Sequence, residues 1–180
     1  MRGAFLLAEE RSIRMEIRFF DQNDSLLEIS NIYESSWKYA YQNIIPQDYL
    51  DRIPTGRWAD SITKAGMRNL VIIESGRMIG TASICPSRWE QYPEYGEIVS
   101  IYFLPEYMGK GYGAYLLKRC VAELQKLGFE KILLWVLEDN IRARKFYEKH
   151  GLVCADVYRN DQIGGKELRE VMYVYSCDPV

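Results

Sequence analysis

Histidine is almost absent from this sequence, and its cysteines are few and widely separated. His150 is the single histidine among 180 residues, which excludes a metal site built from several histidines. No two of the cysteines at 85, 120, 154 and 177 are closer than 23 residues, so no Cys-x-x-Cys pair exists for zinc binding or redox exchange. We therefore expect buried free thiols and no metal cofactor.

The sequence also lacks an excess of one charge and any long hydrophobic run. Lys and Arg number 23 against 25 Asp and Glu, a net charge of −2, and no basic patch dominates, so we expect no nucleic-acid partner. The apolar run at residues 4–8 is too short for the core of a signal peptide or for a membrane span. These features predict a cytoplasmic protein without membrane association.

Apolar residues, in contrast, are sufficient for one core. They make up 48% of the chain, and no repeat, low-complexity tract or linker divides it, which favours a single domain over residues 15–180. Residues 1–14 precede the first strand-like run. We interpret them as an N-terminal extension and leave open whether they belong to the native protein.

Hydrophobic spacing predicts an α/β fold, a mixed sheet with helices packed on it. Period-two or continuous apolar runs predict strands at 15–20, 70–73, 78–84, 97–104, 131–137, 153–157 and 169–175. Helical spacing and capping residues predict helices at 24–42, 46–50, 54–64, 113–127 and 140–150.

A glycine-rich loop connects the strand at 97–104 to the helix at 113–127. Gly109, Gly111 and Gly113 allow close backbone approach to a ligand, and the first helical amides lack carbonyl partners, which favours a phosphate or pyrophosphate site. A tight turn without a ligand fits the spacing equally well. Lys110 is followed by glycine rather than Ser or Thr, and Leu116 stands where a dinucleotide fingerprint needs glycine, so neither of those phosphate loops is present.

A second motif runs from Asn140 to Leu152. Asn140 can cap the helix, and a seven-residue step places Tyr147 on the same helical face. Together the two motifs resemble the GNAT superfamily of acetyl-CoA-dependent N-acetyltransferases over about residues 68–175, most strongly from Glu97 to Leu152. Met108 departs from the Gln or Arg that begins the family's loop pattern.

The resemblance implies a single-domain, mostly antiparallel mixed sheet with a splayed central strand pair, and acetyl-CoA as co-substrate. The family binds the pantetheine arm through strand backbone, here that of Ile101, Tyr102 and Phe103. Loop amides would bind the pyrophosphate, here those of Gly109, Lys110, Gly111, Tyr112, Gly113 and Ala114. Asn140 would hydrogen-bond the arm or the leaving region, and Lys149 would contact the nucleotide phosphates.

The resemblance also suggests the catalytic residues for direct attack of an amine on the thioester. Glu97 is the candidate base, directly or through water, and Tyr147 is the candidate acid for the departing thiolate. The alternatives are that Glu97 is an exposed charge at a strand end and that Tyr147 is a core aromatic residue.

Residues 36–58 correspond to the segment that shapes the acceptor pocket in the family. Trp37, Tyr41 and Tyr49 are candidate substrate-binding residues, with a core role as the alternative. Trp135 stands where the members that acetylate a ribosomal N-terminal alanine carry glutamate, which disfavours that substrate. The acceptor is expected to be a primary amine of a small molecule or protein and stays unidentified. The sequence does not decide whether the protein forms a homodimer. A non-catalytic acyl-CoA sensor or interaction domain on the same fold is the alternative function.

Overall fold

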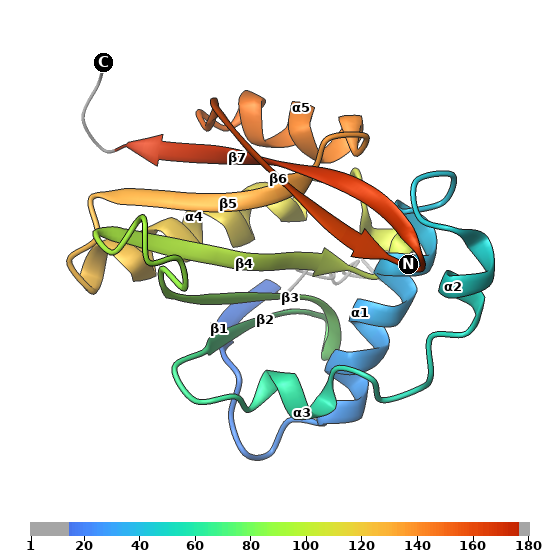
Figure 1. Cartoon of the computed structure of the whole chain (residues 1–180). Coiled ribbons are helices and arrows are strands. Elements are labelled where there is room, and N and C mark those ends of the chain that lie inside the picture. Colours follow the sequence, from blue (N-terminus) through green and yellow to red (C-terminus); the bar gives the residue numbers. More distant parts are fainter. Residues whose placement is uncertain (1–14, 177–180) are drawn as a thin grey trace, which may run out of the picture.

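The computed structural model describes residues 15–176, which form a seven-stranded sheet with helices on both faces (Figure 1). The predicted extension at residues 1–14 and Cys177 lie outside the described residues. The strands are β1 (Met15–Phe19), β2 (Arg68–Glu74), β3 (Arg77–Pro86), β4 (Tyr95–Phe103), β5 (Lys131–Leu137), β6 (Val153–Ile163) and β7 (Lys166–Ser176). The α-helices are α1 (Leu26–Ala40), α2 (Gln47–Asp51), α3 (Ala59–Ile62), α4 (Tyr112–Lys126) and α5 (Ile141–Lys149), and a 3₁₀ turn, η1, spans Pro105–Tyr107.

The order of the strands is β1-β2-β3-β4-β5-β7-β6, and the pairing is antiparallel except between β4 and β5. Alternate side chains of β2 point to opposite faces of the sheet and join the hydrophobic clusters on those two faces. Val71 packs in a cluster with Ile29 and Ile32 of α1, whereas Leu70 and Ile72 belong to the cluster that includes α4. The predicted α/β class and mixed sheet are confirmed. Within residues 15–176, no helix is long and apolar enough to cross a membrane.

The helix ends follow local chemistry. Ser25 caps α1 by accepting a hydrogen bond from the amide of Glu28 at 3.2 Å. Gly128, with φ of +92°, follows the end of α4 as predicted. The predicted helix over 54–64 is wrong in its extent, because the chain turns at Gly56 (φ +81°) and only Ala59–Ile62 is α-helical.

The last two strands are longer than predicted. We expected strands at 153–157 and 169–175, but β6 continues to Ile163 and β7 begins at Lys166. Gly164 and Gly165 both have positive φ and connect the strands in a two-residue hairpin turn. This extension places Arg159 in the sheet directly opposite Glu170.

The central strands β4 and β5 separate after a short parallel ladder. Only Tyr95–Glu97 pair with Lys131–Leu133, and beyond that point the two strands diverge (Figure 1). On the other side of β4 the register with β3 shifts between Ser83 and Ile84, a bulge that leaves Val99 as the extra residue. The predicted splayed pair is confirmed, and it opens a gap in the sheet.

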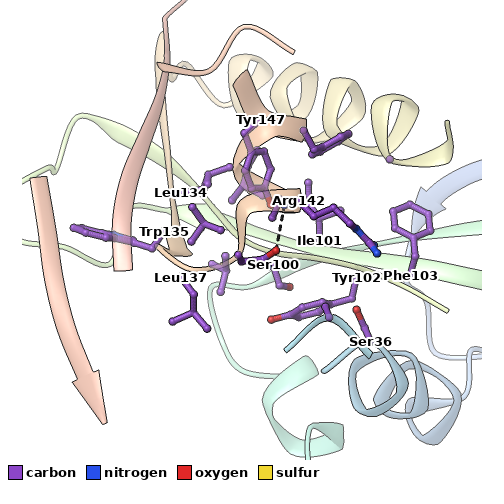
Figure 2. A pocket seen from close by; sticks show the side chains of 18 of the residues that line it. Ser36, Ser100, Ile101, Tyr102, Phe103, Leu134, Trp135, Leu137, Arg142 and Tyr147 are labelled. Carbon is purple, nitrogen blue, oxygen red and sulfur yellow. Dashed lines mark hydrogen bonds between the residues drawn. The ribbon is translucent and has the colours of Figure 1, made fainter. Parts of the chain in front are cut away.

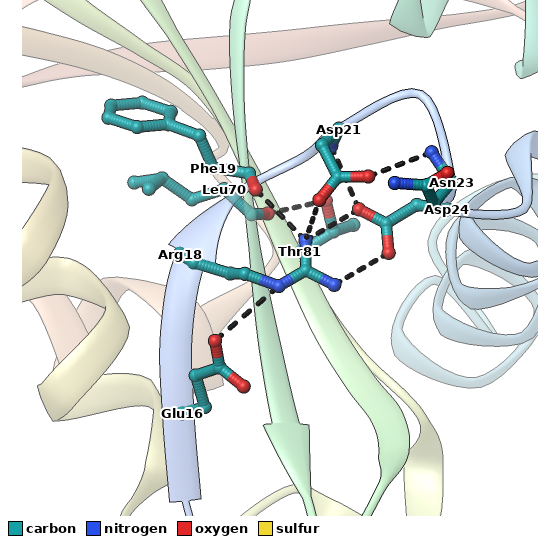
Figure 3. Close-up of polar contacts among 8 residues, drawn as sticks. All are labelled: Glu16, Arg18, Phe19, Asp21, Asn23, Asp24, Leu70 and Thr81. Carbon is teal, nitrogen blue, oxygen red and sulfur yellow. Dashed lines mark hydrogen bonds and ion pairs between the residues drawn. The ribbon is translucent and has the colours of Figure 1, made fainter.

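An ion-pair cluster attaches β1 to the start of α1 (Figure 3). Arg18 donates two hydrogen bonds to the carboxylate of Asp24, at 2.6 and 2.7 Å, and Asp24 also accepts from the amide of Asp21. These contacts lower the pKa of Asp24, with the Arg18 hydrogen bonds as the largest cause. The cluster therefore holds the sheet edge and the helix together only while Asp24 is ionised.

Replacing Asp24 with Asn should lower the free energy of unfolding at pH 7 by about 2 kcal/mol, because charge-assisted hydrogen bonds are lost. A depressed carboxyl pKa stabilises the fold above the unfolded-state pKa of about 3.9 and loses that effect as the pH falls. Denaturant titrations at several pH values should show the wild type and the variant converging below pH about 4. A constant difference down to pH about 2 would contradict this role for Asp24.

The cysteines only partly match the expectation of buried thiols. Cys85 and Cys120 are free and buried, and burial raises the pKa of Cys85 to about 11 and that of Cys120 still further. Cys154 is also free but exposed, so the prediction is wrong there, because its strand β6 lies at the edge of the sheet.

Candidate active site

The gap between β4 and β5 opens into a cavity of about 690 Å³. Its walls come from distant parts of the chain: the end of α1, β4, the glycine loop, β5, α5, and the hairpin of β6 and β7. In Figure 2, β4 supplies Ser100–Phe103, β5 supplies Leu134, Trp135 and Leu137, and Tyr147 comes from α5. The cavity therefore reaches through the sheet from the α5 face to the α1 face.

Beyond Glu97, one edge of β4 has no strand partner among the described residues. Ile101, Tyr102 and Phe103 pair with Ala82, Thr81 and Gly80 of β3 on one side only. Their second edge faces the cavity. An extended ligand with amide groups can add to such an edge, as the predicted pantetheine contacts require.

The glycine loop lies at one end of the same cavity, which Gly109, Gly111, Gly113 and Ala114 line. Gly111 is the N-cap of α4, with φ of +91° and no side-chain capping bond. Backbone amides 109–113 donate to no backbone acceptor within residues 15–176, and such free amides suit an anion. The amide of Ala114 already donates to the carbonyl of Gly111 at 3.1 Å, so it is less available than the sequence suggested.

Asn140 and Lys149 lie at the two ends of α5 and both line the cavity. The Oδ1 of Asn140 accepts a hydrogen bond from the amide of Ala143 at 3.2 Å, so Asn140 caps helix α5 in addition to any contact with a ligand. Its Nδ2 is not used in that bond. Lys149 is exposed, so its ammonium group is accessible to a ligand phosphate.

Tyr147 lies two turns after Asn140 and faces the cavity (Figure 2). Its ring packs on Phe146, with centroids 5.3 Å apart. Burial, with smaller contributions from Tyr102 and Cys120, raises the pKa of Tyr147 well above its usual value. The hydroxyl is therefore protonated at any working pH, which is the state that a general acid needs.

Glu97 also lines the cavity, but its carboxylate is fully hydrogen-bonded and only 1% exposed. Arg88 donates Nη2 to Oε1 at 2.7 Å and both Nε and its amide to Oε2 at 3.0 Å, and Trp89 donates Nε1 to Oε1 at 3.2 Å. Four donors occupy about all the lone pairs of a carboxylate. Glu97 can accept a proton only if one donor leaves, and the indole of Trp89 makes the longest contact.

The structure separates the three predicted acceptor residues. Trp37 and Tyr41 line the cavity from the end of α1, and their rings pack edge to face with centroids 5.0 Å apart. Tyr49 does not line it: a Cβ at Gly164 would lie 2.8 Å from the Cβ of Tyr49, so this tyrosine packs against the hairpin turn between β6 and β7. The assignment of Tyr49 to the pocket is therefore not supported by its position.

One wall of the cavity could not be predicted from the sequence. Its members are charged or aromatic side chains from the β3–β4 loop, β6 and β7, namely Arg88, Trp89, Arg159 and Glu170. No local motif marks them, because strand register brings them together. The dipeptide Gly164–Gly165, which favours a two-residue hairpin turn, was the sequence signal for the hairpin that carries two of them.

Comparisons with known proteins agree with this geometry. The sequence model of the acetyltransferase (GNAT) family matches residues 26–152. An uncharacterised N-acetyltransferase of Bacillus subtilis, YuaI, is 31% identical over 152 residues, covering 82% of this chain and 86% of the relative. The [ribosomal protein bS18]-alanine N-acetyltransferase of Haemophilus influenzae is 34% identical over 110 residues, 59% of this chain and 71% of that enzyme.

Solved structures with the same fold include two with ligands named. PaiA N-acetyltransferase from Thermoplasma acidophilum, in complex with coenzyme A, superposes with a TM-score of 0.72 at 20% identity, covering 91% of this chain and 99% of that one. YncA, a putative acetyltransferase from Salmonella typhimurium with acetyl-CoA, has a TM-score of 0.69 at 22% identity and covers 93% and 96%. At these identities the likeness establishes the fold.

Proposed function

This chain belongs to the GNAT acetyltransferase family, and from that premise we propose that it transfers an acetyl group from acetyl-CoA to a primary amine. The observation that carries the proposal is a single cavity with three features. The unpaired edge of β4 and the free amides of the glycine loop line it together, and Tyr147 faces it.

The donor half of the cavity suits acetyl-CoA. The β4 edge at 101–103 offers backbone groups for the pantetheine arm, and amides 109–113 offer donors for the pyrophosphate at the positive end of α4. Asn140 through Nδ2 and Lys149 through its exposed ammonium group complete the proposed contacts. Acetyl-CoA, when bound, supplies a thioester carbonyl activated for attack by an amine.

The proposed reaction joins the acceptor nitrogen to the acetyl carbon and breaks the bond between that carbon and sulfur. The nitrogen, which starts as an ammonium, loses two protons: one before the attack and one as the bond to sulfur breaks. The sulfur takes a proton from the hydroxyl of Tyr147, and the second proton from the nitrogen restores that hydroxyl. The described cysteines all lie outside the cavity lining, which supports direct transfer rather than an acyl-cysteine.

We assign removal of the proton from the acceptor ammonium to Glu97, provided that one of its hydrogen-bond donors is exchanged. The carboxylate lines the cavity, but it must exchange one of its four donors for the acceptor or for a water. Because Trp89 is on a loop and gives the longest of these bonds, exchange of this one hydrogen bond for a bond to the acceptor or a water is the proposed route.

A panel of amines tests the proposed function, with release of coenzyme A as the readout. It should hold amino acids, polyamines, aminoglycosides and peptides with free N-termini. We expect time-dependent coenzyme A release with at least one class and a product heavier by one acetyl group. Tight binding of acetyl-CoA with no acetylation of any amine would contradict the proposal and favour a non-catalytic acyl-CoA-binding domain.

Replacing Gly111 with Ala tests the loop as the pyrophosphate site. At φ +91° a Cβ costs about 1–2 kcal/mol, so relaxation of the backbone should misalign the loop amides and raise the Kd of acetyl-CoA about tenfold. Calorimetric titration measures the change. Gly128→Ala is the matched control, because Gly128 has φ of +92°, equally open surroundings and no place in the cavity lining. An equal Kd for both variants would contradict the loop assignment.

A further inference from the structure

An ion pair lines the part of the cavity formed by Trp89, Trp135, Arg159 and Glu170, which we call the acceptor half. Arg159 of β6 and Glu170 of β7 face each other in register, and both line the cavity. Nη2 of Arg159 is in ion-pair contact with Oε2 of Glu170. The guanidinium thus lies beside the carboxylate at the surface that an acceptor would contact.

Two buried N–H groups here have no hydrogen-bond partner within residues 15–176. They are Nε of Arg159 and the indole Nε1 of Trp135, and both side chains line the cavity. Buried polar atoms in proteins are nearly always hydrogen-bonded. Two donors without partners in one cavity wall indicate a ligand that carries an acceptor group, such as a carboxylate.

Two tryptophans fix the position of the guanidinium. The Cζ of Arg159 lies 4.9 Å from the ring centroid of Trp89 and 5.7 Å from that of Trp135, and the two rings are 5.3 Å apart. Such contacts hold the planar guanidinium with little freedom. A fixed guanidinium is well suited to bind a carboxylate through two parallel hydrogen bonds.

Glu170 offers the complementary charge. It is faced by Arg159 and Asp161 of β6, by Arg88 of the β3–β4 loop, and by the tyrosines at 41 and 102. Burial raises the pKa of Glu170, and the charge of Arg159 opposes that rise. An ammonium group bound here would favour the ionised form and would take the place of Arg159 as its partner.

We propose that the acceptor is a small amino-carboxylate such as a free amino acid, whose carboxylate binds Arg159 and whose amino group binds Glu170. This inference rests on the proposed acetyl transfer. Binding exchanges one ion pair for two, so neither of these partly buried charges is left without a partner. Acceptors that lack a carboxylate near the amine, including the N-termini of proteins, would leave Arg159 without its new partner.

The experiment compares matched acceptors that differ only at the carboxylate. Free amino acids, their α-amides and the corresponding decarboxylated amines are assayed by release of coenzyme A at saturating acetyl-CoA. For the wild type, we expect kcat/KM for the best amino acid to exceed that for its amide about tenfold or more, since a charge-assisted hydrogen bond is lost in the amide.

Two variants and a control separate the roles of the pair. Arg159→Gln should abolish the preference for the carboxylate, and Glu170→Gln should lower kcat/KM for amino acid and amide alike. Arg169→Gln is the matched control, because Arg169 is next to Glu170 in sequence but pairs with Glu138, stacks on Tyr158 and does not line the cavity. Circular dichroism melts confirm folding, and calorimetric titration of the amino acid into the protein with coenzyme A measures binding without turnover.

The outcomes distinguish this inference from the proposed function. Equal kcat/KM for amino acids and amides in the wild type would overturn the inference while acetyl transfer stands. If Arg159→Gln lowered kcat/KM equally for the amino acid and for its amide, that result would also overturn the inference while acetyl transfer stands. If no amine is acetylated, the proposed function fails, and calorimetric binding of amino acids that is abolished by Arg159→Gln would still support the amino-carboxylate site.

Discussion

Replacing Tyr147 with Phe is expected to lower kcat for acetyl transfer by about 100-fold, with little change in the KM for acetyl-CoA. General acid catalysis by a positioned side chain contributes about 10²–10⁴. Tyr147 faces the cavity, and burial raises its pKa well above the usual value, so the hydroxyl keeps its proton until the thiolate leaves. Steady-state kinetics with the acceptor found in the amine panel measures the effect.

Tyr173→Phe is the matched control for Tyr147. The hydroxyl of Tyr173 donates to Glu148 at 2.5 Å and accepts from Arg144 at 3.1 Å, and Tyr173 does not line the cavity. Its loss should lower the free energy of unfolding by about 1 kcal/mol and leave kcat unchanged. Full turnover by Tyr147→Phe would remove Tyr147 from the mechanism.

Replacing Glu97 with Gln is expected to have two separable effects. If Glu97 accepts the proton, kcat/KM should fall about 100-fold, and the acidic limb of its pH profile should disappear. The free energy of unfolding should also fall by about 3 kcal/mol, because the amide NH₂ would meet the donors of Arg88 in place of a buried carboxylate oxygen.

Arg88→Gln provides the comparison for Glu97. It removes the ion pair and leaves the carboxylate, so it should destabilise the protein and retain the acidic limb. The pH–rate profiles and denaturant titrations of both variants decide between the roles. An unchanged acidic limb in Glu97→Gln, together with the loss of stability, would assign Glu97 to fixing the β3–β4 loop alone.

The donor half of the site could be predicted because its residues are contiguous. The loop at 109–114 and the helix that carries Asn140 and Tyr147 are each a short segment whose glycines, cap and spacing constrain the backbone directly. The splay of β4 from β5 followed from the resemblance. Spacing alone could not locate the bulge at Val99, since a bulge depends on how two strands pair.

The acceptor half could not be predicted because it depends on register. Arg159 and Glu170 meet only because a two-residue turn makes one hairpin of β6 and β7, and the sequence interpretation ended the first of those strands too early. Tyr49 shows the converse error. Helical spacing places an aromatic residue on a face, but it does not say whether that face meets a cavity or, as here, a neighbouring turn.

A crystal structure of the protein with acetyl-CoA would show whether the donor binds in the gap between β4 and β5. We expect the pantetheine arm along the free edge of β4 at 101–103, the pyrophosphate on amides 109–113, and the thioester sulfur within hydrogen-bonding reach of the Tyr147 hydroxyl. Acetyl-CoA bound outside the gap between β4 and β5, or with its sulfur turned away from Tyr147, would contradict this expectation.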